Sequence, residues 1–275
     1  MMHPPTPAPP SQEEVLARAI DAIGTDQFVP LALEYLRTAI AFRGCFVTRL
    51  EGKRPPEHIY DNVRAERRSE VVDAWLDGAY LLDPFYVAYI EHRPCMAARL
   101  RDVAPDRFPQ SSYFREYYSG IRLHDEAAVL IDVPGGQHLF YSLGRLIGEP
   151  RFSLRDITAA KRILPVFASI NRRHFERAYT LPTPDQAESA PIVTSIAPDD
   201  IDNAMDAFGT GLLTDRESQI AILILKGHSS KSIAERIGVS PGTVKIHRRN
   251  FYRKLNISSQ SELFSLFLDS LAQAA

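Results

Sequence analysis

The sequence predicts an α+β protein, in which an antiparallel sheet sandwiched with helices is followed by a small all-α module. Three observations lead to this prediction. The 275 residues exceed what one compact core usually holds. A segment rich in Pro, Ser and Asp, 181–207, reads as a linker between the two parts. From residue 211 onward, nine Lys or Arg stand against five Asp or Glu, although the whole chain has a net charge of −2. The second part is therefore the basic one.

The first domain is predicted to span residues 11–180, after a disordered Pro-rich tail at 1–10. Ser11 and Glu14 form a capping box that opens a helix. Hydrophobic periodicity and turn signals then predict a helix at 28–41, strands at 45–51 and 57–63, a helical region at 69–78 and on through 80–90, a strand at 97–103, a short helix at 111–120, a hairpin of strands at 126–133 and 138–146, and a long helix at 153–179. This order predicts about five antiparallel strands carrying helices, a GAF/PAS-like sandwich.

The second domain, residues 208–275, is predicted to contain four short helices. Capping boxes open the first helix at Thr214 and the fourth at Ser259, and Ser240 caps the third with Pro241 in its first turn. Gly227 and Gly238 end the first two helices. Two helices joined by a short Gly-containing turn indicate a helix-turn-helix.

The third of these helices has an apolar and a basic face. At about 100° per residue, Val244, Phe251 and Leu255 share one side and dock on the core. The opposite side carries Lys245, Ile246, Arg249 and Arg253. A cationic helix of this size fits the DNA major groove, where Lys and Arg neutralise phosphates and pair with guanine. The alternative is a solvated basic face.

The same residues resemble the LuxR-type helix-turn-helix. The matching positions are Leu213-Thr214-Asp215-Arg216-Glu217, Gly227, Ile233-Ala234, Ser240, Thr243-Val244-Lys245, His247 and Lys254-Leu255; Gln219 departs from the family's usual Glu. The resemblance implies a double-stranded DNA operator, with Lys245, Ile246 and Arg249 near bases and Thr243, His247 and Arg248 near the backbone. It also implies a homodimer through the fourth helix, for which Phe264, Leu268 and Leu271 are the candidates. Alternatively the linker or the first domain covers these three residues.

The first domain lacks the acidic pattern of a receiver domain and the G-x-x-x-x-G-K-[ST] motif of an ATPase. It resembles, more weakly, the autoinducer-binding domain of quorum-sensing regulators, through Asp83-Pro84 and the order of its elements. The resemblance implies that Asp83 binds an amide, but Glu70 and Ala74 stand where that family has Trp and Tyr. We therefore expect a small amphipathic effector of lactone or amide type, with these candidate ligand-binding residues: Trp75, Tyr80, Asp83, Tyr86 and Tyr117. The alternatives are another ligand, a dimerisation or protein-partner module, and Asp83-Pro84 as a simple helix-stop turn.

The remaining signals exclude other classes. His124, Asp125 and Glu126 are titratable, but no nucleophile motif or metal spacing accompanies them, so we expect no enzyme, metal or cofactor. Cys45 and Cys95 are expected to be reduced. The sequence shows no signal peptide and no apolar run of about 18–20 residues. We expect a cytoplasmic bacterial transcriptional regulator that does not enter the membrane.

Overall fold

The computed structural model describes residues 9–91, 96–180, 208–209 and 211–274. Most of the predicted tail and all of the predicted linker lie outside these residues. The centre of the first domain is a five-stranded antiparallel sheet in the order β2-β1-β5-β4-β3. Its strands are β1 Gly44–Leu50, β2 Glu57–Asp61, β3 Met96–Arg99, β4 Leu123–Val133 and β5 Gln137–Leu146. The predicted α+β fold class is confirmed.

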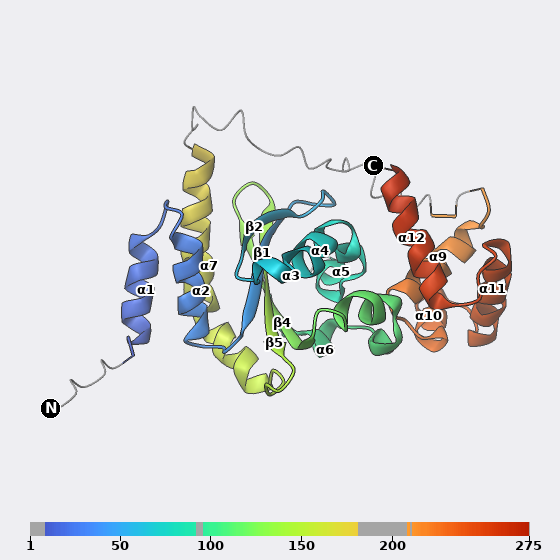
Figure 1. Cartoon of the computed structure of the whole chain (residues 1–275), viewed down its shortest axis with the longest axis horizontal. Helices are drawn as coiled ribbons and strands as arrows, with labels where there is room; N and C mark the ends of the chain where they lie inside the picture. Colours follow the sequence, from blue (N-terminus) through green and yellow to red (C-terminus); the bar gives the residue numbers. More distant parts are fainter. Residues whose placement is uncertain (1–8, 92–95, 181–207, 210, 275) are drawn as a thin grey trace.

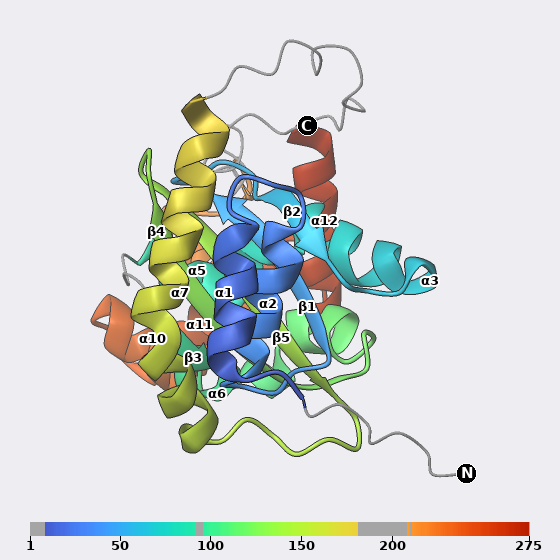
Figure 2. The same ribbon diagram turned by 90° about the vertical axis from the view of Figure 1, so that its left-hand side faces the viewer.

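One face of the sheet is covered by three helices (Figures 1 and 2): α1 Gln12–Asp21, α2 Phe28–Arg37 and α7 Leu154–Thr180. Alternation along the strands supplies the apolar surface beneath them. Val129 and Ile131 of β4 join Phe28 and Phe167 in the core on this side. Thr38 begins the turn that ends α2, which therefore stops short of the predicted residue 41.

The opposite face is covered by a chain of short helical segments, here called the second helix layer. Its members are α3 Ala65–Arg68, η1 Ser69–Asp73, α4 Ala74–Leu76, η2 Ala79–Leu82, α5 Pro84–Ile90, α6 Leu100–Val103, η3 Phe108–Gln110 and η4 Tyr113–Tyr118. The predicted strand 97–103 is wrong in its second half, because the carboxylate of Asp102 hydrogen-bonds the backbone and guanidinium of Arg99 and starts α6. The predicted helix at 69–78 is divided between η1 and α4.

The C-terminal module consists of α9 Asp215–Leu225, α10 Ser230–Ile237, α11 Pro241–Lys254 and α12 Gln260–Ala274. The capping box at Thr214 forms as predicted. At Ser259 the side chain accepts from the backbone of Glu262, whereas the Glu262 carboxylate accepts from the backbone of Ser258 and the hydroxyl of Ser259. Gly238 ends α10 in the left-handed conformation, at φ 69°. No helix within the described residues is long and apolar enough to cross a membrane.

The module packs on the outer side of the second helix layer, with α11 farthest from the sheet (Figure 1). The backbone N–H of Arg107 donates to the carbonyl of Gly227 at 3.1 Å, and Ser112 Oγ donates to the carbonyl of Gln260 at 2.8 Å. Arg236 forms a 2.7 Å ion pair with Glu91. A single apolar cluster runs from the sheet through the second helix layer into the module. The second helix layer thus contacts both the sheet and the module.

Candidate nucleic-acid interface and ligand cavity

Helix α11 is fixed in the module by its cap and its apolar side. The Ser240 side chain accepts a hydrogen bond from the backbone of Thr243 at 3.0 Å, which satisfies one free N–H of the first turn. Val244 and Phe251 are fully buried, as expected from the helical spacing. The rotation of the helix is therefore set by packing.

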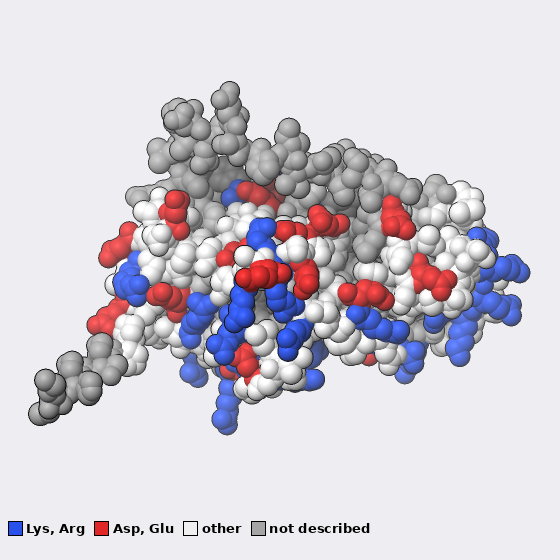
Figure 3. Space-filling view, viewed as in Figure 1, with Lys and Arg blue, Asp and Glu red and all other residues white. Residues whose placement is uncertain are grey.

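The opposite face of α11 is exposed and cationic. Lys245, Arg249 and Arg253 are exposed and form no ion pair within the described part of the chain. Ile246 stands among them with 53% of its surface accessible. Figure 3 shows Lys and Arg gathered at the end of the molecule where α11 lies. Unpaired cations around an apolar side chain are a surface that suits the edges of base pairs and phosphates.

The residues expected near a DNA backbone are partly covered. Thr243, His247 and Arg248 are each half-buried. The guanidinium of Arg248 lies 5.0 Å from the ring centre of Tyr252 and donates to its hydroxyl at 3.1 Å. Lys254 is committed within the module, since its ammonium contacts the Glu217 carboxylate at 2.6 Å.

Helix α12 differs from the sequence interpretation at Phe264. This ring was expected to contact a second copy of the chain, but it is only 4% exposed and belongs to the core, like Leu263 and Phe267. The physical reason is that the start of α12 packs against the second helix layer, through Ser112. Leu266 is exposed instead, at 37%. The side chains of Leu268 and Leu271 lie outside the described residues.

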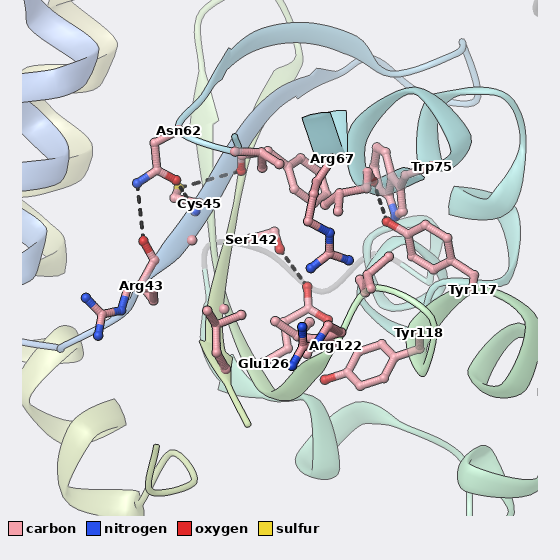
Figure 4. Close-up of a pocket in the computed structure, with 18 of the residues that line it drawn as sticks. Arg43, Cys45, Asn62, Arg67, Trp75, Tyr117, Tyr118, Arg122, Glu126 and Ser142 are labelled. Carbon is pink, nitrogen blue, oxygen red and sulfur yellow. Dashed lines mark hydrogen bonds between the residues drawn. The ribbon is translucent and has the colours of Figure 1, made fainter. Parts of the chain in front are cut away.

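A cavity of about 640 Å³ lies between the sheet and the second helix layer (Figure 4). Phe46 of β1 and Glu126 and Ser142 of the central hairpin line the sheet side, and Trp75 and Tyr117 line the helical side. The walls are largely apolar and aromatic. The size falls in the range of about 300–1,000 Å³ typical of small-molecule sites.

Of the five predicted ligand-binding residues, Trp75, Asp83 and Tyr117 line this cavity. Tyr80 and Tyr86 do not, and their expected role is corrected. Tyr80 packs with its ring centre 5.5 Å from Trp75 and 4.8 Å from Tyr86, so the two tyrosines form part of the core behind the indole.

Asp83 is held by the protein itself. One carboxylate oxygen accepts from the backbone of Phe85 at 2.7 Å and caps α5. The other accepts from the indole N–H of Trp75 at 2.8 Å and the hydroxyl of Tyr113 at 3.3 Å. Burial raises the pKa of Asp83, and these hydrogen bonds oppose that shift. Asp83 thus ends η2 and, as the N-cap, starts α5.

Other polar groups of the cavity were not selected from the sequence. Glu126 was considered only as part of a titratable run; its carboxyl is 5% exposed and accepts a 2.7 Å hydrogen bond from Ser142. Burial and the neighbouring charge of Asp83 raise the pKa of Glu126 well above its usual value. The hydroxyl of Tyr118 is buried and has no hydrogen-bond partner among the described residues. Arg67 and Arg122 complete this polar end. One signal was available, since alternation places Glu126 on the same face of β4 as Ala128 and Leu130.

Nothing in the described residues suggests metal chemistry, because no three His, Cys, Asp or Glu side chains converge there. Cys45 lines the cavity but is buried and free, and burial raises the pKa of its thiol beyond the usual range. A thiol that keeps its proton is a poor nucleophile.

Residues 211–267 match the family model of bacterial regulatory proteins, luxR family. The chain is 31% identical over 192 residues to an HTH-type transcriptional regulator in the exeN 3′ region of Aeromonas salmonicida, covering 70% of this chain and 96% of that protein. It is 42% identical over 57 residues to the transcriptional regulatory protein UhpA of Escherichia coli, covering 21% of this chain and 29% of UhpA. Among solved structures, the LBD domain of VqsR from Pseudomonas aeruginosa aligns with a TM-score of 0.52 at 19% identity, covering 60% of this chain and 96% of that domain. The last similarity shows a shared fold for the N-terminal domain.

Proposed function

This chain belongs to the LuxR family of bacterial regulatory proteins, a family of DNA-binding transcriptional regulators and not of enzymes, and from that premise we propose that it is a ligand-responsive regulator. In this proposal residues 208–275 bind the operator. Residues 11–180, which share a fold with the LBD domain of VqsR, bind a small amphipathic molecule of the quorum-sensing type.

The DNA-binding part of the proposal assigns base contacts to Lys245, Ile246 and Arg249. It assigns backbone contacts to Thr243, His247, Arg248 and Arg253. What supports it is exposure, since the first three side chains are exposed. Helix α11 itself lies at the end of the molecule away from the first domain (Figure 1).

The observation that carries the sensing part is the placement of η4 between the cavity and the module. Tyr113, Tyr117 and Tyr118 of η4 line the cavity. The residue directly before η4, Ser112, donates to the carbonyl of Gln260 at the start of α12. A ligand that shifts η4 by a fraction of an ångström would therefore alter a contact of the DNA-binding module. Differential contact of this kind is what an allosteric effect requires.

Native mass spectrometry of the full chain, purified without denaturation, tests the sensing part. We expect a mass increment of a small organic molecule that disappears on denaturation and that changes the affinity for DNA when it is added back. A protein that carries no such molecule, and whose DNA affinity does not respond to extracts of its host, would instead favour a protein-partner or dimerisation role for the first domain.

Homodimerisation remains part of the proposal. Phe264 no longer supports it, because its ring is covered within the chain. The exposed Leu266 is the described apolar side chain of α12 that is available to a second copy.

A further inference from the structure

We propose that the cavity takes an amphipathic organic anion, whose carboxylate lies at the end formed by Tyr118, Glu126, Arg67 and Arg122. This inference rests on the proposed sensing function and specifies its ligand class. It differs from the lactone or amide expected from the sequence.

Asp83 is not free to bind a ligand, because its carboxylate is already hydrogen-bonded within the protein. Both of its oxygens accept hydrogen bonds from Trp75, Tyr113 and the backbone of Phe85. The single N–H of the Trp75 indole donates to the same carboxylate. A ligand amide would have to displace these buried contacts, so the pair contributes an apolar indole surface to the cavity instead.

The polar end of the cavity contains a hydrogen-bond donor that has no partner among the described residues, the Tyr118 hydroxyl. The hydroxyl of Tyr118 is buried, lines the cavity and has no partner among the described residues. A buried hydroxyl without a partner is costly, so its position calls for an acceptor in the cavity. Burial raises the pKa of Tyr118, so the phenol keeps its proton and can donate it in a hydrogen bond.

The charge at the polar end of the cavity depends on Glu126, Arg67 and Arg122. Glu126 is buried, with its pKa raised, and no ion pair links it to a cation in the described structure. It is therefore a neutral acid that can donate. The guanidinium groups of Arg67 and Arg122 point toward the end of the cavity where Glu126 lies (Figure 4). Arg67 has two distant contacts, with the Glu70 carboxylate and the Gly120 carbonyl, each at 3.5 Å. Arg122 forms no ion pair in the described part of the chain.

Together these groups supply donors: two guanidiniums, a phenol and a protonated acid. The acceptor that such a set favours is an anion with at least two oxygens, and guanidinium pairs well with a carboxylate. The other end offers Phe46, Trp75 and Val71, which suit an apolar body. Arg122 is also held at φ 55°, an unusual conformation for a residue with a side chain, next to this end of the cavity.

The test uses the full chain and Trp75, its only tryptophan, as a fluorescent reporter. Three probes are compared below their micellar concentrations: dodecanoate, methyl dodecanoate and N-decanoyl homoserine lactone. We expect dodecanoate to change the fluorescence saturably and to bind at least about tenfold more tightly than its neutral ester, with an affinity that falls as salt rises.

Three variants locate the carboxylate. Tyr118→Phe should raise the Kd of dodecanoate about fivefold but leave the melting temperature of the free protein unchanged or higher, because the lost hydroxyl has no partner. Arg122→Gln should raise that Kd by a similar factor and leave the Kd of the ester unchanged. Glu126→Gln should change it by less than about threefold, because an amide also donates. The matched controls are Tyr35→Phe and Arg162→Gln on α2 and α7, beyond the sheet.

The outcomes separate the two proposals. Equal binding of acid, ester and lactone, unaffected by Arg122→Gln and Tyr118→Phe, would overturn the anion assignment and leave a sensor of neutral ligands. A large gain in dodecanoate affinity in Glu126→Gln would also overturn it, because it would mean that Glu126 is ionised and repels the anion. Failure of all three probes and of host extracts to bind would count against the sensing function itself.

Discussion

At the scale of single residues, two buried carboxyl groups of the cavity have different roles. Asp83 and Glu126 are 2% and 5% exposed. Asp83 receives three hydrogen bonds, from two side chains and one backbone N–H, whereas Glu126 receives one from Ser142. Hydrogen bonds to the charged form favour ionisation, so Asp83 ionises first and its charge helps to keep Glu126 protonated. Asp83 thus holds parts of the protein together through its hydrogen bonds, and Glu126 remains available as a hydrogen-bond donor.

The structural role of Asp83 predicts a large loss of stability in Asp83→Ala. The change removes the cap of α5 and leaves the buried N–H of Trp75 unpaired, for a combined cost of about 2–4 kcal/mol in the free energy of unfolding. Urea denaturation followed by circular dichroism measures it. Asp77→Ala is the matched control, because Asp77 is exposed two residues after Trp75. Equal stability of the two variants would show that the Asp83 contacts contribute little.

The raised pKa of Glu126 predicts a pH dependence of stability. Above pH 4.5, the usual carboxyl pKa, the native carboxyl keeps a proton that the unfolded chain has lost. The native state then binds more protons, so this group's contribution to stability falls as pH rises from there toward the folded pKa. Glu126→Gln should therefore gain stability relative to the natural protein from about pH 5 upward. Thermal melts over this range measure the difference, with the exposed Glu116→Gln as control. A difference that does not change with pH would mean that Glu126 titrates normally.

At the scale of elements, the sequence predicted best those helices and strands whose ends are marked by capping residues or turns. α9, α10 and α11 begin at Thr214, Ser229 and Ser240, whose side chains cap them, and apolar spacing sets their buried faces. β4 and β5 follow from alternation and a glycine turn. These signals are local, so they can be read without the fold.

The second helix layer could not be predicted in the same way. Its segments are three to seven residues long, and η1 and η4 are π-helical turns fixed by contacts far along the chain, such as Tyr117 to the carbonyl of Val71. The polar end of the cavity depends on these contacts, because the unpartnered state of the Tyr118 hydroxyl is a property of everything around it. Asp83, in contrast, was found through a motif, but the motif could not show which donors would occupy it.

The contact between the second helix layer and the module predicts a specific effect of Gly227→Ala. A Cβ at Gly227 would lie 3.1 Å from Cα of Phe108 and 3.2 Å from Cβ of Ser111, too close for unchanged packing. We expect faster hydrogen exchange at 105–112 and weaker protection of that segment from proteases. Gly238→Ala is the matched control, because Gly238 also has a positive φ, 69°, but its Cβ would meet nothing within 4 Å. Both variants share a strain of about 1 kcal/mol, so only the difference reports undocking.

At the scale of the whole molecule, the cavity, the second helix layer and the module are arranged in series, and α11 lies at the far end (Figure 1). The first domain therefore does not cover the basic face of α11. In the proposed function, a ligand would act on DNA binding through docking contacts such as those at Arg107, Ser112 and Arg236. An effect on the spacing of two modules in a dimer would fit this geometry better than unmasking of α11.

Two substitutions in α12 distinguish a covered helix from a dimer seam. Phe264→Asp would bury a charge in the core and should lower the melting temperature by several degrees. Leu266→Asp changes an exposed side chain and should leave folding intact but weaken self-association. Sedimentation velocity of the full chain measures the second effect, with the exposed Ser265→Asp as control. Unchanged association in Leu266→Asp would place any dimer contact elsewhere.

The basic side chains on the outer face of α11 differ in how free they are. Lys245 and Arg249 are exposed to solvent, so changing either to Ala should cost about 1–3 kcal/mol of binding free energy at a selected site and relax the preference at one base pair. Arg248 is restrained by Tyr252, at the edge of the same face. Arg248→Ala should weaken binding to every sequence and lower the slope of affinity against salt by about one unit. Fluorescence anisotropy with duplexes selected from a random library gives both quantities, and Lys161→Ala, an exposed change on α7, serves as control. If Lys245→Ala and Arg249→Ala bound the selected and scrambled duplexes as the natural protein does, α11 would not be the helix that reads DNA.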